Sequence, residues 1–362
     1  MNVFDVAVIG GGPAGSCCAA MLARLGLSVV ILERGAYVAL KVGETLPPGI
    51  RNLLEPLNVW GNFLADGHLR SPGNISVWGS ERPIENDFIF NPNGSGWHVD
   101  RGRFDRMLAD AAVGAGSRLI LRASVRACAR NSDGTWRVQA RIDGAPRELS
   151  CAAVVVAAGR LGSGLTQSGP RTHVDPLVGL VGFFPDEGEG DARTLVEACE
   201  SGWWYCASLP QRRRIAVFMT DNDLVPPRKR RLEDAWREAL RQSVHARARI
   251  GGKIPLGALT IVAANTYRRA CLSGDRWVVV GDAAYTFDPL SSQGIYKAMA
   301  SGMTAAAAIA ASISGSPGPL LEYACDADAA FTRYLRARAS YYRRENRWSS
   351  SPFWRRRHAF DD

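Results

Sequence analysis

Uninterrupted apolar runs in the chain predict strands that are buried on both faces. The first is Val6–Ile9, and comparable runs follow at 28–32, 153–157 and 277–280. Such continuous runs are typical of a parallel sheet covered by helices, whereas half-exposed strands alternate apolar and polar positions. Between the first two runs, Pro13 and an apolar stripe that ends at Gly26 predict a helix. The order strand, helix, strand predicts the start of a Rossmann-like α/β domain.

The middle of the chain has a different pattern. Short runs rich in β-branched and aromatic residues predict a mainly antiparallel sheet. The runs are 75–78, 88–90, 177–184, 194–199, 203–209, 215–220 and 259–263. A helix of small residues is then predicted from Gly294 to Ser314, and a helical, arginine-rich segment closes the chain. The predicted fold is therefore α/β with an inserted domain of α+β character.

These patterns divide the chain into six segments. The α/β domain is predicted in three pieces, 1–70, 99–170 and 269–314. The inserted sheet domain is predicted in two pieces, 71–98 and 171–268, and the C-terminal segment is 315–362. With 362 residues and 46% apolar content, the chain can fill two cores. No charged and apolar leader precedes the first strand, so a cytoplasmic protein is expected. The alanine-rich stretch 298–314 is too short and too weakly apolar to predict stable membrane insertion.

Composition argues against several kinds of site. The eight cysteines and five histidines show no spacing typical of metal ligands, so no metal site is predicted. The net charge is +9, with arginines clustered at 212–214, 228–231, 333–347 and 355–357. No nucleic-acid recognition motif accompanies this charge, so no nucleic-acid partner is expected. The C-terminal clusters are interpreted either as a solvated helix face or as a docking surface for an acidic protein or peptide partner.

The turn after the first strand has glycines in the pattern G-x-G-x-x-G. In this pattern the first glycine permits a tight turn, the second lets the backbone approach a pyrophosphate, and the third packs the helix on the strand. An acid at the end of the second strand can accept hydrogen bonds from a ribose diol. The residues predicted to contact the dinucleotide are Gly10, Gly12, Pro13, Ala14, Gly15, Glu33 and Arg34. Since only Arg34 could pair with a 2′-phosphate, FAD or NAD(H) is predicted rather than NADPH.

A second motif, late in the chain, discriminates between these cofactors. The strand 277–280 leads to Asp282, and a loop with Pro289 leads to a helix that begins at Gly294 and Ile295. Asp282 is placed to hold a sugar-like hydroxyl, and the start of the helix offers N–H groups to an oxygen or a pyrophosphate. A nicotinamide enzyme has no need of this second half. The predicted cofactor is therefore FAD.

With these motifs the chain resembles the FAD-dependent monooxygenases of the glutathione-reductase-like type, whose relatives include the flavin-dependent halogenases and the geranylgeranyl-reductase-like proteins. Further similar segments are 101–105, 123–125 and 153–160. The resemblance implies that Arg101 lies on the FAD phosphates or ribityl chain and that the backbone at Val125 meets the adenine. It also implies that the strand ending at Gly159 returns to the cofactor. The reaction it implies passes through a flavin C4a-hydroperoxide formed with O2.

A smaller group within this superfamily is similar in more segments. Residues 43–48, 175–179, 202–205 and 347–356 resemble flavoproteins that hydroxylate a tryptophan side chain of a partner protein during maturation of a tryptophylquinone cofactor. The resemblance implies a monooxygenase acting on an indole-type aromatic substrate, most specifically a peptidyl tryptophan. Two other readings stay open. One is a flavin-dependent reductase, oxidase or hydroxylase of a small natural product or lipid, and the other is a non-catalytic flavoprotein that senses redox state.

Few protein groups are obligatory for such chemistry, and Glu44 is the first candidate. The resemblance puts its loop, with Gly43, near the isoalloxazine, where a dry pocket would raise the pKa of the carboxyl group enough for proton transfer. The alternative role for Glu44 is a structural acceptor in the turn. Asp288 is a second catalytic candidate. The aromatic residues that could stack on a flat substrate, if they converge on one pocket rather than fill the sheet core, are Trp78, Trp97, Trp203, Trp204 and Tyr205.

Two departures from the larger family narrow the function. Halogenases of this type carry a lysine after the turn that here contains Glu44, and residues 71–75 hold none. Because that lysine is the reactive amine, halogenation is the less favoured alternative. An Asp-Gly pair that helps to hold NADPH in the single-component hydroxylases is replaced here by Ala158 and Gly159. The electron donor is therefore left open between NAD(P)H and a separate flavin reductase, with O2 as cosubstrate.

Overall fold

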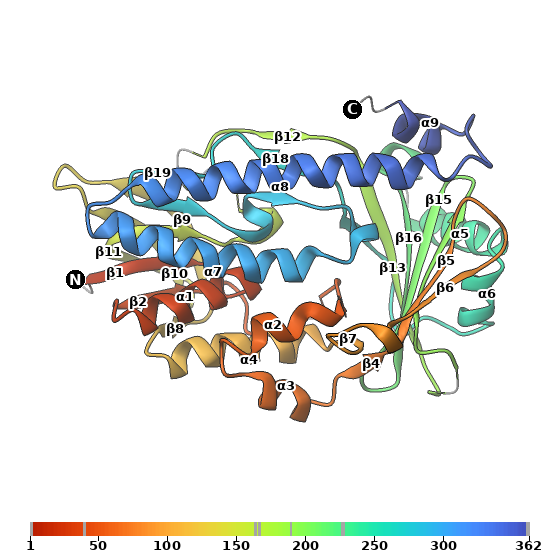
Figure 1. Cartoon of the computed structure of the whole chain (residues 1–362), viewed down its shortest axis with the longest axis horizontal. Helices are drawn as coiled ribbons and strands as arrows, with labels where there is room; N and C mark the ends of the chain where they lie inside the picture. Colours follow the sequence, from red (N-terminus) through yellow and green to blue (C-terminus); the bar gives the residue numbers. More distant parts are fainter. Residues whose placement is uncertain are drawn as a thin grey trace.

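The computed structural model describes residues 3–38, 41–162, 165, 168–188, 190–225 and 229–359. The described strands form an eight-stranded sheet, a seven-stranded sheet and two sheets of three strands. Figure 1 shows the eight-stranded sheet at the end of the molecule that holds the N-terminus and the seven-stranded sheet at the opposite end. Arg228, in one of the predicted arginine clusters, lies outside the described residues.

The eight-stranded sheet has the parallel core that the apolar runs predict. Its main order is β19 (Ser273–Gly274), β20 (Trp277–Val279), β11 (Ala145–Val156), β1 (Val3–Ile9), β2 (Val29–Leu32) and β8 (Arg118–Ile120). Except for the antiparallel pair β19·β20, the neighbours in this order run parallel. The antiparallel strands β9 (Ala123–Arg130) and β10 (Trp136–Ile142) extend from β11. This arrangement brings the carboxyl ends of β1, β2 and β11 to one edge of the sheet.

Apolar layers cover both faces of this sheet. On one face α1 (Pro13–Arg24), α4 (Arg101–Gly114) and α7 (Gly294–Ile313) share a core with Val6, Val8 and Val155. On the other face Trp136 of β10 and Phe331 of α8 (Gly318–Arg343) belong to a second core. Burial on both faces explains why these strands have no polar alternation. The predicted helix of small residues is confirmed as α7.

The seven-stranded sheet is mainly antiparallel, as predicted. Its order is β17 (Thr260–Ala263), β13 (Leu177–Pro185), β16 (Arg213–Asp221), β15 (Gly202–Leu209), β14 (Thr194–Cys199), β5 (Gly73–Val77) and β6 (Ile84–Asp87), with β14 and β5 paired in parallel. One face packs on α5 (Lys229–Arg241) and α6 (His245–Ile250), and the other on the end of α8 and on α9 (Pro352–His358). The predicted fold class is confirmed. The exact segment boundaries stay a prediction, because strand pairing does not define domain limits.

Two small sheets and two short helices complete the parts that frame the site. The sheet β3 (Thr45–Leu46), β7 (Gly96–His98) and β4 (Leu69–Ser71) begins one residue after Glu44. The sheet β12 (Arg171–His173), β18 (Tyr267–Arg269) and β21 (Tyr285–Thr286) ends two residues before Asp288. The helices α2 (Arg51–Leu54) and α3 (Trp60–Ala65) follow β3. Of the two catalytic candidates, Glu44 therefore directly precedes the short strand β3, and Asp288 lies just after the short strand β21.

Residues 88–90 do not form the predicted strand. Phe88–Phe90 is a short 3-10 helix, and Ile89 and Phe90 are 80% and 93% exposed. The N–H of Phe88 donates to the carbonyl oxygen of Pro72, and no described strand pairs with the run. Three apolar residues without a neighbouring strand cannot form a ladder, so the local apolar pattern is misleading here.

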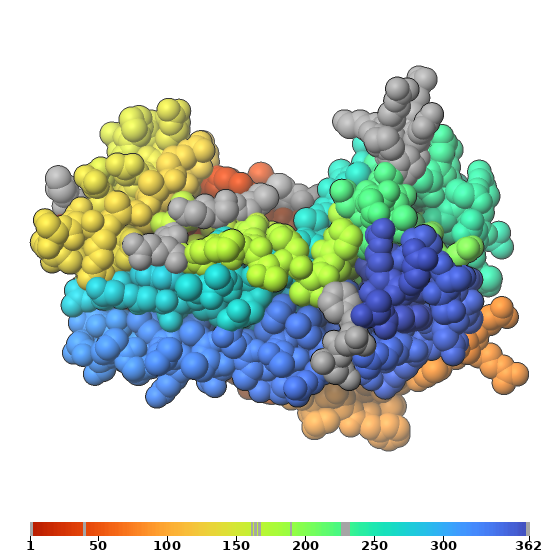
Figure 2. All heavy atoms as spheres, turned by 90° about the horizontal axis from the view of Figure 1, so that it is seen from above, coloured from red at the N-terminus to blue at the C-terminus, as the bar shows by residue number. Residues whose placement is uncertain are grey.

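The C-terminal segment is more than a solvated helix face. In Figure 1, α8 runs from the eight-stranded sheet to the seven-stranded sheet, and in Figure 2 the blue C-terminal residues form a continuous band along the molecule. α8 buries Phe331, Arg338 and Tyr342, among others. Its remaining face is exposed, so the solvated-face interpretation is correct for only part of the helix. None of the helices in the described ranges is long and apolar enough to cross a membrane.

Candidate active site

The glycine-rich turn between β1 and α1 is shaped by close packing. Gly10 has a φ of +107°, and a Cβ there would lie 2.4 Å from the carbonyl oxygen of Ala157. A Cβ at Gly15 would lie 1.9 Å from the carbonyl oxygen of Gly10. At Gly12, by contrast, a Cβ would meet nothing within 4 Å. Packing therefore requires Gly10 and Gly15, whereas Gly12 borders open space at a helix start that has no side-chain cap.

Glu33 lies at the end of β2 and closes one side of this turn. Its carboxylate accepts hydrogen bonds from the backbone N–H groups of Gly11 at 2.7 Å and Gly35 at 2.6 Å. The hydroxyl of Tyr37 donates to the carbonyl oxygen of Gly11 at 2.8 Å. Arg34 is exposed beside the acid. The predicted dinucleotide residues of the first half are thus adjacent in space.

The two halves of the predicted site meet at the start of α1. A Cβ at Gly281 would lie 2.8 Å from the Cβ of Ala14, and a Cβ at Gly302 would lie 2.1 Å from the carbonyl oxygen of Ala14. The N–H of Gly281 donates to the hydroxyl of Ser301 at 2.9 Å. Such contacts are open only to small residues, so the turn after β20 and the helix α7 lie directly against α1. Residues almost 270 positions apart in the sequence therefore form one site.

Asp282 is held as a carboxylate by two cations. The ammonium of Lys297 donates to its Oδ1 at 2.8 Å, and Arg160 Nε lies 3.5 Å from its Oδ2. Burial alone would raise the pKa of Asp282, but the charges of Lys297 and Arg160 outweigh it and bring the pKa below its ordinary value. The side chain stays 33% exposed. It therefore remains accessible to a ligand hydroxyl.

Arg101 fixes the loop that leads to Glu44. From the first turn of α4, its guanidinium donates to the carbonyl oxygens of Val42 at 2.9 Å and Gly43 at 3.0 Å, and it pairs with Asp105 at 3.1 Å. Gly43 has a φ of +98°, a conformation that favours glycine. The arginine and the glycine together set the turn immediately before Glu44.

Glu44 is a buried carboxyl group without a hydrogen-bond partner. The residue is 2% exposed. Neither of its carboxyl oxygens has a partner within the described ranges. Burial raises the pKa of Glu44 to about 7, and the positive charge of Arg101 together with the nearby backbone N–H groups of Gly43 and Glu44 offsets only part of this shift. A group with such a pKa exchanges its proton near neutral pH, as a general acid or base requires.

A hollow of about 400 Å³ opens beside Glu44. Its lining includes Arg101, Phe183 and Arg213 from α4, β13 and β16. On the next residue along the chain from Glu44, the hydroxyl of Thr45 lies 2.5 Å from the hydroxyl of Tyr205. Burial, reinforced by the nearby Glu44, raises the pKa of Tyr205, so this phenol stays protonated. Thr45 and Tyr205 thus place neutral hydroxyl groups next to Glu44, while the hollow itself is also lined by charged side chains such as Asp100 and Arg213.

Comparison with known proteins agrees with this geometry. A family model described as an FAD binding domain matches residues 3–337. This chain belongs to the FAD-binding-domain family. LodB of Marinomonas mediterranea, an FAD-dependent oxidoreductase by name, is 31% identical over 368 residues, which cover 99% of this chain and 98% of LodB.

Solved structures of similar proteins share the whole fold. CmlS, a flavin-dependent halogenase, has a TM-score of 0.89 at 26% identity. The match covers 100% of this chain and 68% of the CmlS chain. The peptidyl tryptophan dihydroxylase QhpG, essential for tryptophylquinone cofactor biogenesis, has a TM-score of 0.80 at 23% identity. The match covers 99% of this chain and 79% of the QhpG chain. At that identity, QhpG supports the fold alone. This FAD-binding-domain protein is an FAD-dependent enzyme of the monooxygenase and halogenase group.

The residues of this FAD-binding-domain protein fit the cofactor. The open space at Gly12 suits the passage of a pyrophosphate, and Asp282 suits a ribityl hydroxyl. α7 begins at Gly294, after the 3-10 turn Pro289–Ser291, without a side-chain cap. Its first N–H groups, including that of Ile295, are therefore available to an oxygen of the flavin.

Two more predicted cofactor residues lie in segments next to the ends of β2 and β11. Val125 is on β9, and the N–H of Ala123, two residues earlier, donates to the carbonyl oxygen of Glu33 at 2.9 Å. Gly159 follows β11 with a φ of +61° and has nothing within 4 Å of the position of a Cβ. Their contacts with FAD stay a prediction.

The five aromatic residues expected around one pocket are separated by the structure. Trp203 and Trp78 lie in the core between the seven-stranded sheet and α9, whereas Trp204 lies in the core on the opposite face. Consecutive residues of a strand point to opposite faces, so Trp203 and Trp204 cannot share a pocket. Trp97 belongs to the core of the FAD-binding part. Tyr205 does contact the Glu44 loop, through Thr45.

Asp288 is buried and fully engaged. It is 1% exposed, and its carboxylate accepts hydrogen bonds from Arg338 at 3.2 Å, from Tyr342 at 2.8 Å and from the N–H of Leu290 at 3.0 Å. Both oxygens of the carboxylate therefore already accept hydrogen bonds from the protein, and the buried side chain does not face a ligand site. The structure favours a positioning role over the proton transfer considered for it.

The two cations that hold Asp282 were missed by sequence reasoning. Lys297 follows Gly294 by three residues and is only 8% exposed. A single lysine in an alanine-rich, apolar helix signals a buried partner, because an unpaired ammonium is costly to bury. Arg160 follows Gly159 directly, but no local pattern reveals that it reaches Asp282.

Glu44→Gln is expected to stabilise the apo-protein above neutral pH. The pKa of Glu44 is raised from 4.5 to about 7, so the folded state holds a proton that the unfolded state has lost. The stability that this proton linkage provides is present below about pH 4.5 and is lost as the pH rises through about 7. At about 1.36 kcal/mol per pKa unit, the wild type loses on the order of 3 kcal/mol of folding free energy. Denaturant unfolding of both proteins at about pH 5 and about pH 8 measures it. If the free energies of unfolding of the variant and the wild type differed by the same amount at both pH values, the burial of an ionisable Glu44 would be contradicted.

Proposed function

We propose that this enzyme is a monooxygenase that hydroxylates an indole-type aromatic ring, most specifically a tryptophan side chain of a partner protein in quinone cofactor biogenesis. The proposal includes action in the cytoplasm. The fold shared with QhpG and the tryptophan-hydroxylase-like segments of the sequence support it. The observation that carries it is the buried, unpartnered Glu44.

An aromatic ring that gains a hydroxyl group must lose a proton from the same carbon. A carboxylate with a pKa of about 7 can accept that proton at neutral pH. Bound FAD would supply the activation of O2, after reduction by NAD(P)H or by a separate flavin reductase. The hydroxyl groups of Tyr205 and Thr45 form a hydrogen bond with each other and none with Glu44, so the carboxylate is left for the substrate. Burial of Glu44 also keeps bulk water from competing for the proton.

Halogenation is the second candidate, because CmlS is a flavin-dependent halogenase at 26% identity. Two observations weigh against it. No lysine occurs between Lys41 and Lys229, the stretch that would carry the reactive amine. Lys41 pairs with Asp105 at 2.8 Å and Lys297 with Asp282 at 2.8 Å, so each of these ammonium groups is engaged. Hydroxylation needs no such amine and therefore fits this chain better.

Mass analysis of the product tests the two functions together. The FAD-loaded protein is reduced chemically, then exposed to O2 with chloride and bromide present, so that the result does not depend on the electron donor. The substrates are N-acetyltryptophanamide, a tryptophan-containing peptide and the proteins encoded by adjacent reading frames. We expect a product that gains oxygen and no halogen. A chlorinated or brominated product would establish halogenation instead, and H2O2 without any modified product would contradict both.

A protein substrate requires a docking surface, and the C-terminal basic face is our candidate. It consists of exposed arginines of α8, of α9 and of the residue directly after α8, namely Arg333, Arg336, Arg343, Arg344 and Arg355. An acidic partner would be attracted to such a face, which raises the association rate. This face is continuous with the end of α8 that packs on the seven-stranded sheet, next to the site.

The double variant Arg333→Glu, Arg336→Glu is expected to slow association with a protein substrate by roughly tenfold at low salt. Oxidation of N-acetyltryptophanamide is expected to stay unchanged, because neither arginine lines the hollow beside Glu44. Arg141→Glu, at an exposed position of β10, is the control for a charge change elsewhere on the surface. Stopped-flow association at two salt concentrations measures the effect, and an equal loss in the control would rule out docking at this face.

A further inference from the structure

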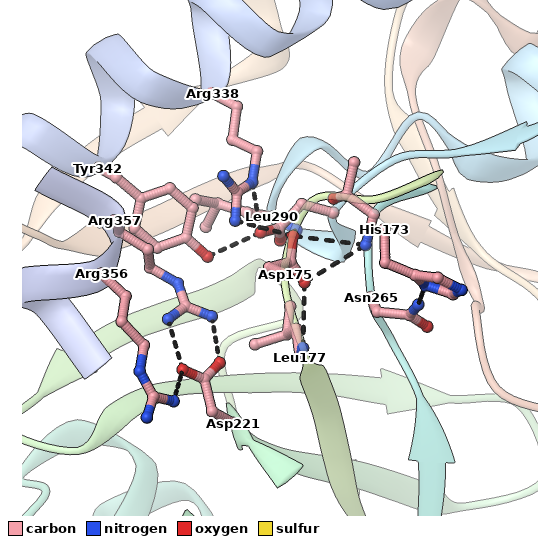
Figure 3. Close-up of polar contacts among 12 residues, drawn as sticks. His173, Asp175, Leu177, Asp221, Asn265, Leu290, Arg338, Tyr342, Arg356 and Arg357 are labelled. Carbon is pink, nitrogen blue, oxygen red and sulfur yellow. Dashed lines mark hydrogen bonds and ion pairs between the residues drawn. The ribbon is translucent and has the colours of Figure 1, made fainter. Parts of the chain in front are cut away.

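A cluster of buried charges lies where α8 passes the flavin loop, defined here as residues 288–293. Figure 3 shows Arg338 and Tyr342 pointing from α8 toward this cluster. Both donate to Oδ2 of Asp288, at 3.2 and 2.8 Å. Arg338 also donates to Asp175 at 3.0 Å, and Asp175 lies two residues before β13 begins. The side chains of Asp175, Asp288 and Arg338 are at most 4% exposed.

The flavin loop is built outward from Asp288. Its Oδ1 accepts from the N–H of Leu290 at 3.0 Å, and its carbonyl oxygen accepts from the hydroxyl of Ser291 at 3.0 Å. Its own N–H donates to the hydroxyl of Tyr334 at 2.5 Å, again on α8. Ser292 then adopts the left-handed conformation, with a φ of 50°. A serine is disfavoured there, so the surrounding contacts must hold this conformation.

The same cluster reaches into the seven-stranded sheet. The hydroxyl of Tyr342 accepts a hydrogen bond from Trp203 Nε1 of β15 at 3.1 Å while it donates to Asp288. The N–H groups of Leu177 and Thr266 donate to Asp175 at 3.0 and 3.3 Å. Two buried carboxylates therefore share Arg338. Buried ion pairs of this kind contribute little net stability, but they fix geometry closely, because breaking one leaves an unpaired buried charge.

We infer that Arg338 and Tyr342 are positioning residues for the flavin loop and that they act through Asp288. By holding the loop, they set the direction of the N–H groups at the start of α7, at Gly294 and Ile295 directly after the loop. The affinity for FAD and the reduction potential of the bound flavin depend on those N–H groups. The inference rests on the proposed use of this site for FAD.

The test compares Asp288→Asn, Arg338→Gln and Tyr342→Phe with the wild type. FAD affinity is measured by fluorescence titration of the apo-protein, and the reduction potential by spectroelectrochemistry of the loaded protein. Each variant is expected to raise the Kd for FAD by about tenfold and to shift the potential, since each leaves a buried group without its partner. The double variant Asp288→Asn, Arg338→Gln is expected to bind FAD about as weakly as the single variants, because both act on the same contact.

Asp328→Asn is the matched control on the same helix. It removes a partly exposed ion pair with Arg268 and touches no residue of the flavin loop. Unchanged FAD affinity and potential in all three folded variants would overturn the inference. If Asp288→Asn fails to fold, Tyr342→Phe carries the test, because it removes a single hydroxyl group. A wild-type protein that binds no FAD would instead refute the proposed function, and the inference with it.

Discussion

The Gly12→Ala protein is expected to fold like the wild type and to bind FAD roughly ten- to a hundredfold more weakly. A Cβ at Gly12 meets nothing within 4 Å in the protein itself, and the φ of −77° is open to alanine. The added methyl group therefore clashes only with a ligand that passes close to the backbone. Fluorescence titration with FAD and thermal unfolding of the apo-protein measure the two effects separately.

Two further glycines provide the comparison. Gly15→Ala is expected to weaken both FAD binding and apo-protein stability, since its Cβ would lie 1.9 Å from the carbonyl oxygen of Gly10. Gly114→Ala, at the end of α4, would meet nothing within 4 Å and is expected to leave FAD binding unchanged. Wild-type affinity in Gly12→Ala would mean that no pyrophosphate approaches this turn.

Glu44→Gln is expected to lower the rate of hydroxylation by roughly 10²- to 10⁴-fold, the usual contribution of a general base. The wild-type rate is expected to rise with pH as Glu44 loses its proton near its pKa of about 7. The variant is expected to lack this rise, because glutamine does not titrate. Single-turnover rates of the reduced, FAD-loaded protein across this pH range measure both effects.

Glu55→Gln is the control for this experiment, because Glu55 is an exposed acid that pairs with Arg51 on the surface. It is expected to keep the wild-type rate and pH profile. Glu44→Asp is expected to recover part of the rate, since it restores a carboxyl group at a slightly different position. A wild-type pH profile in Glu44→Gln would assign the proton transfer to another group.

The FAD-binding part could be predicted from the sequence because its constraints are local. A glycine such as Gly15 is required by a contact with Gly10 five residues away, and that spacing is visible in the chain. Glu33 and Asp282 each follow an apolar run, and the end of such a run marks the edge of the sheet. The contact of Ala14 with Gly281 and Gly302 then follows from the fold that these strands require.

The substrate side could not be predicted in the same way. Strand register decides which face of the seven-stranded sheet Trp203 and Trp204 each pack on, and both have the same apolar character. The partners of Asp288 lie 50 and 54 residues farther along the chain, on a helix whose arginines look solvated in the sequence. Burial of Arg338 follows from the crossing of α8 over the flavin loop, which no local pattern reveals.

Isotope incorporation tests the proposed monooxygenase most directly. The reduced, FAD-loaded protein is exposed to ¹⁸O₂ together with its aromatic substrate, and the modified ring is analysed by mass spectrometry. The account predicts that the new hydroxyl oxygen comes from O₂ and that Glu44→Gln forms much less of this product. A product whose oxygen comes from water, or one that carries a halogen instead, would contradict it.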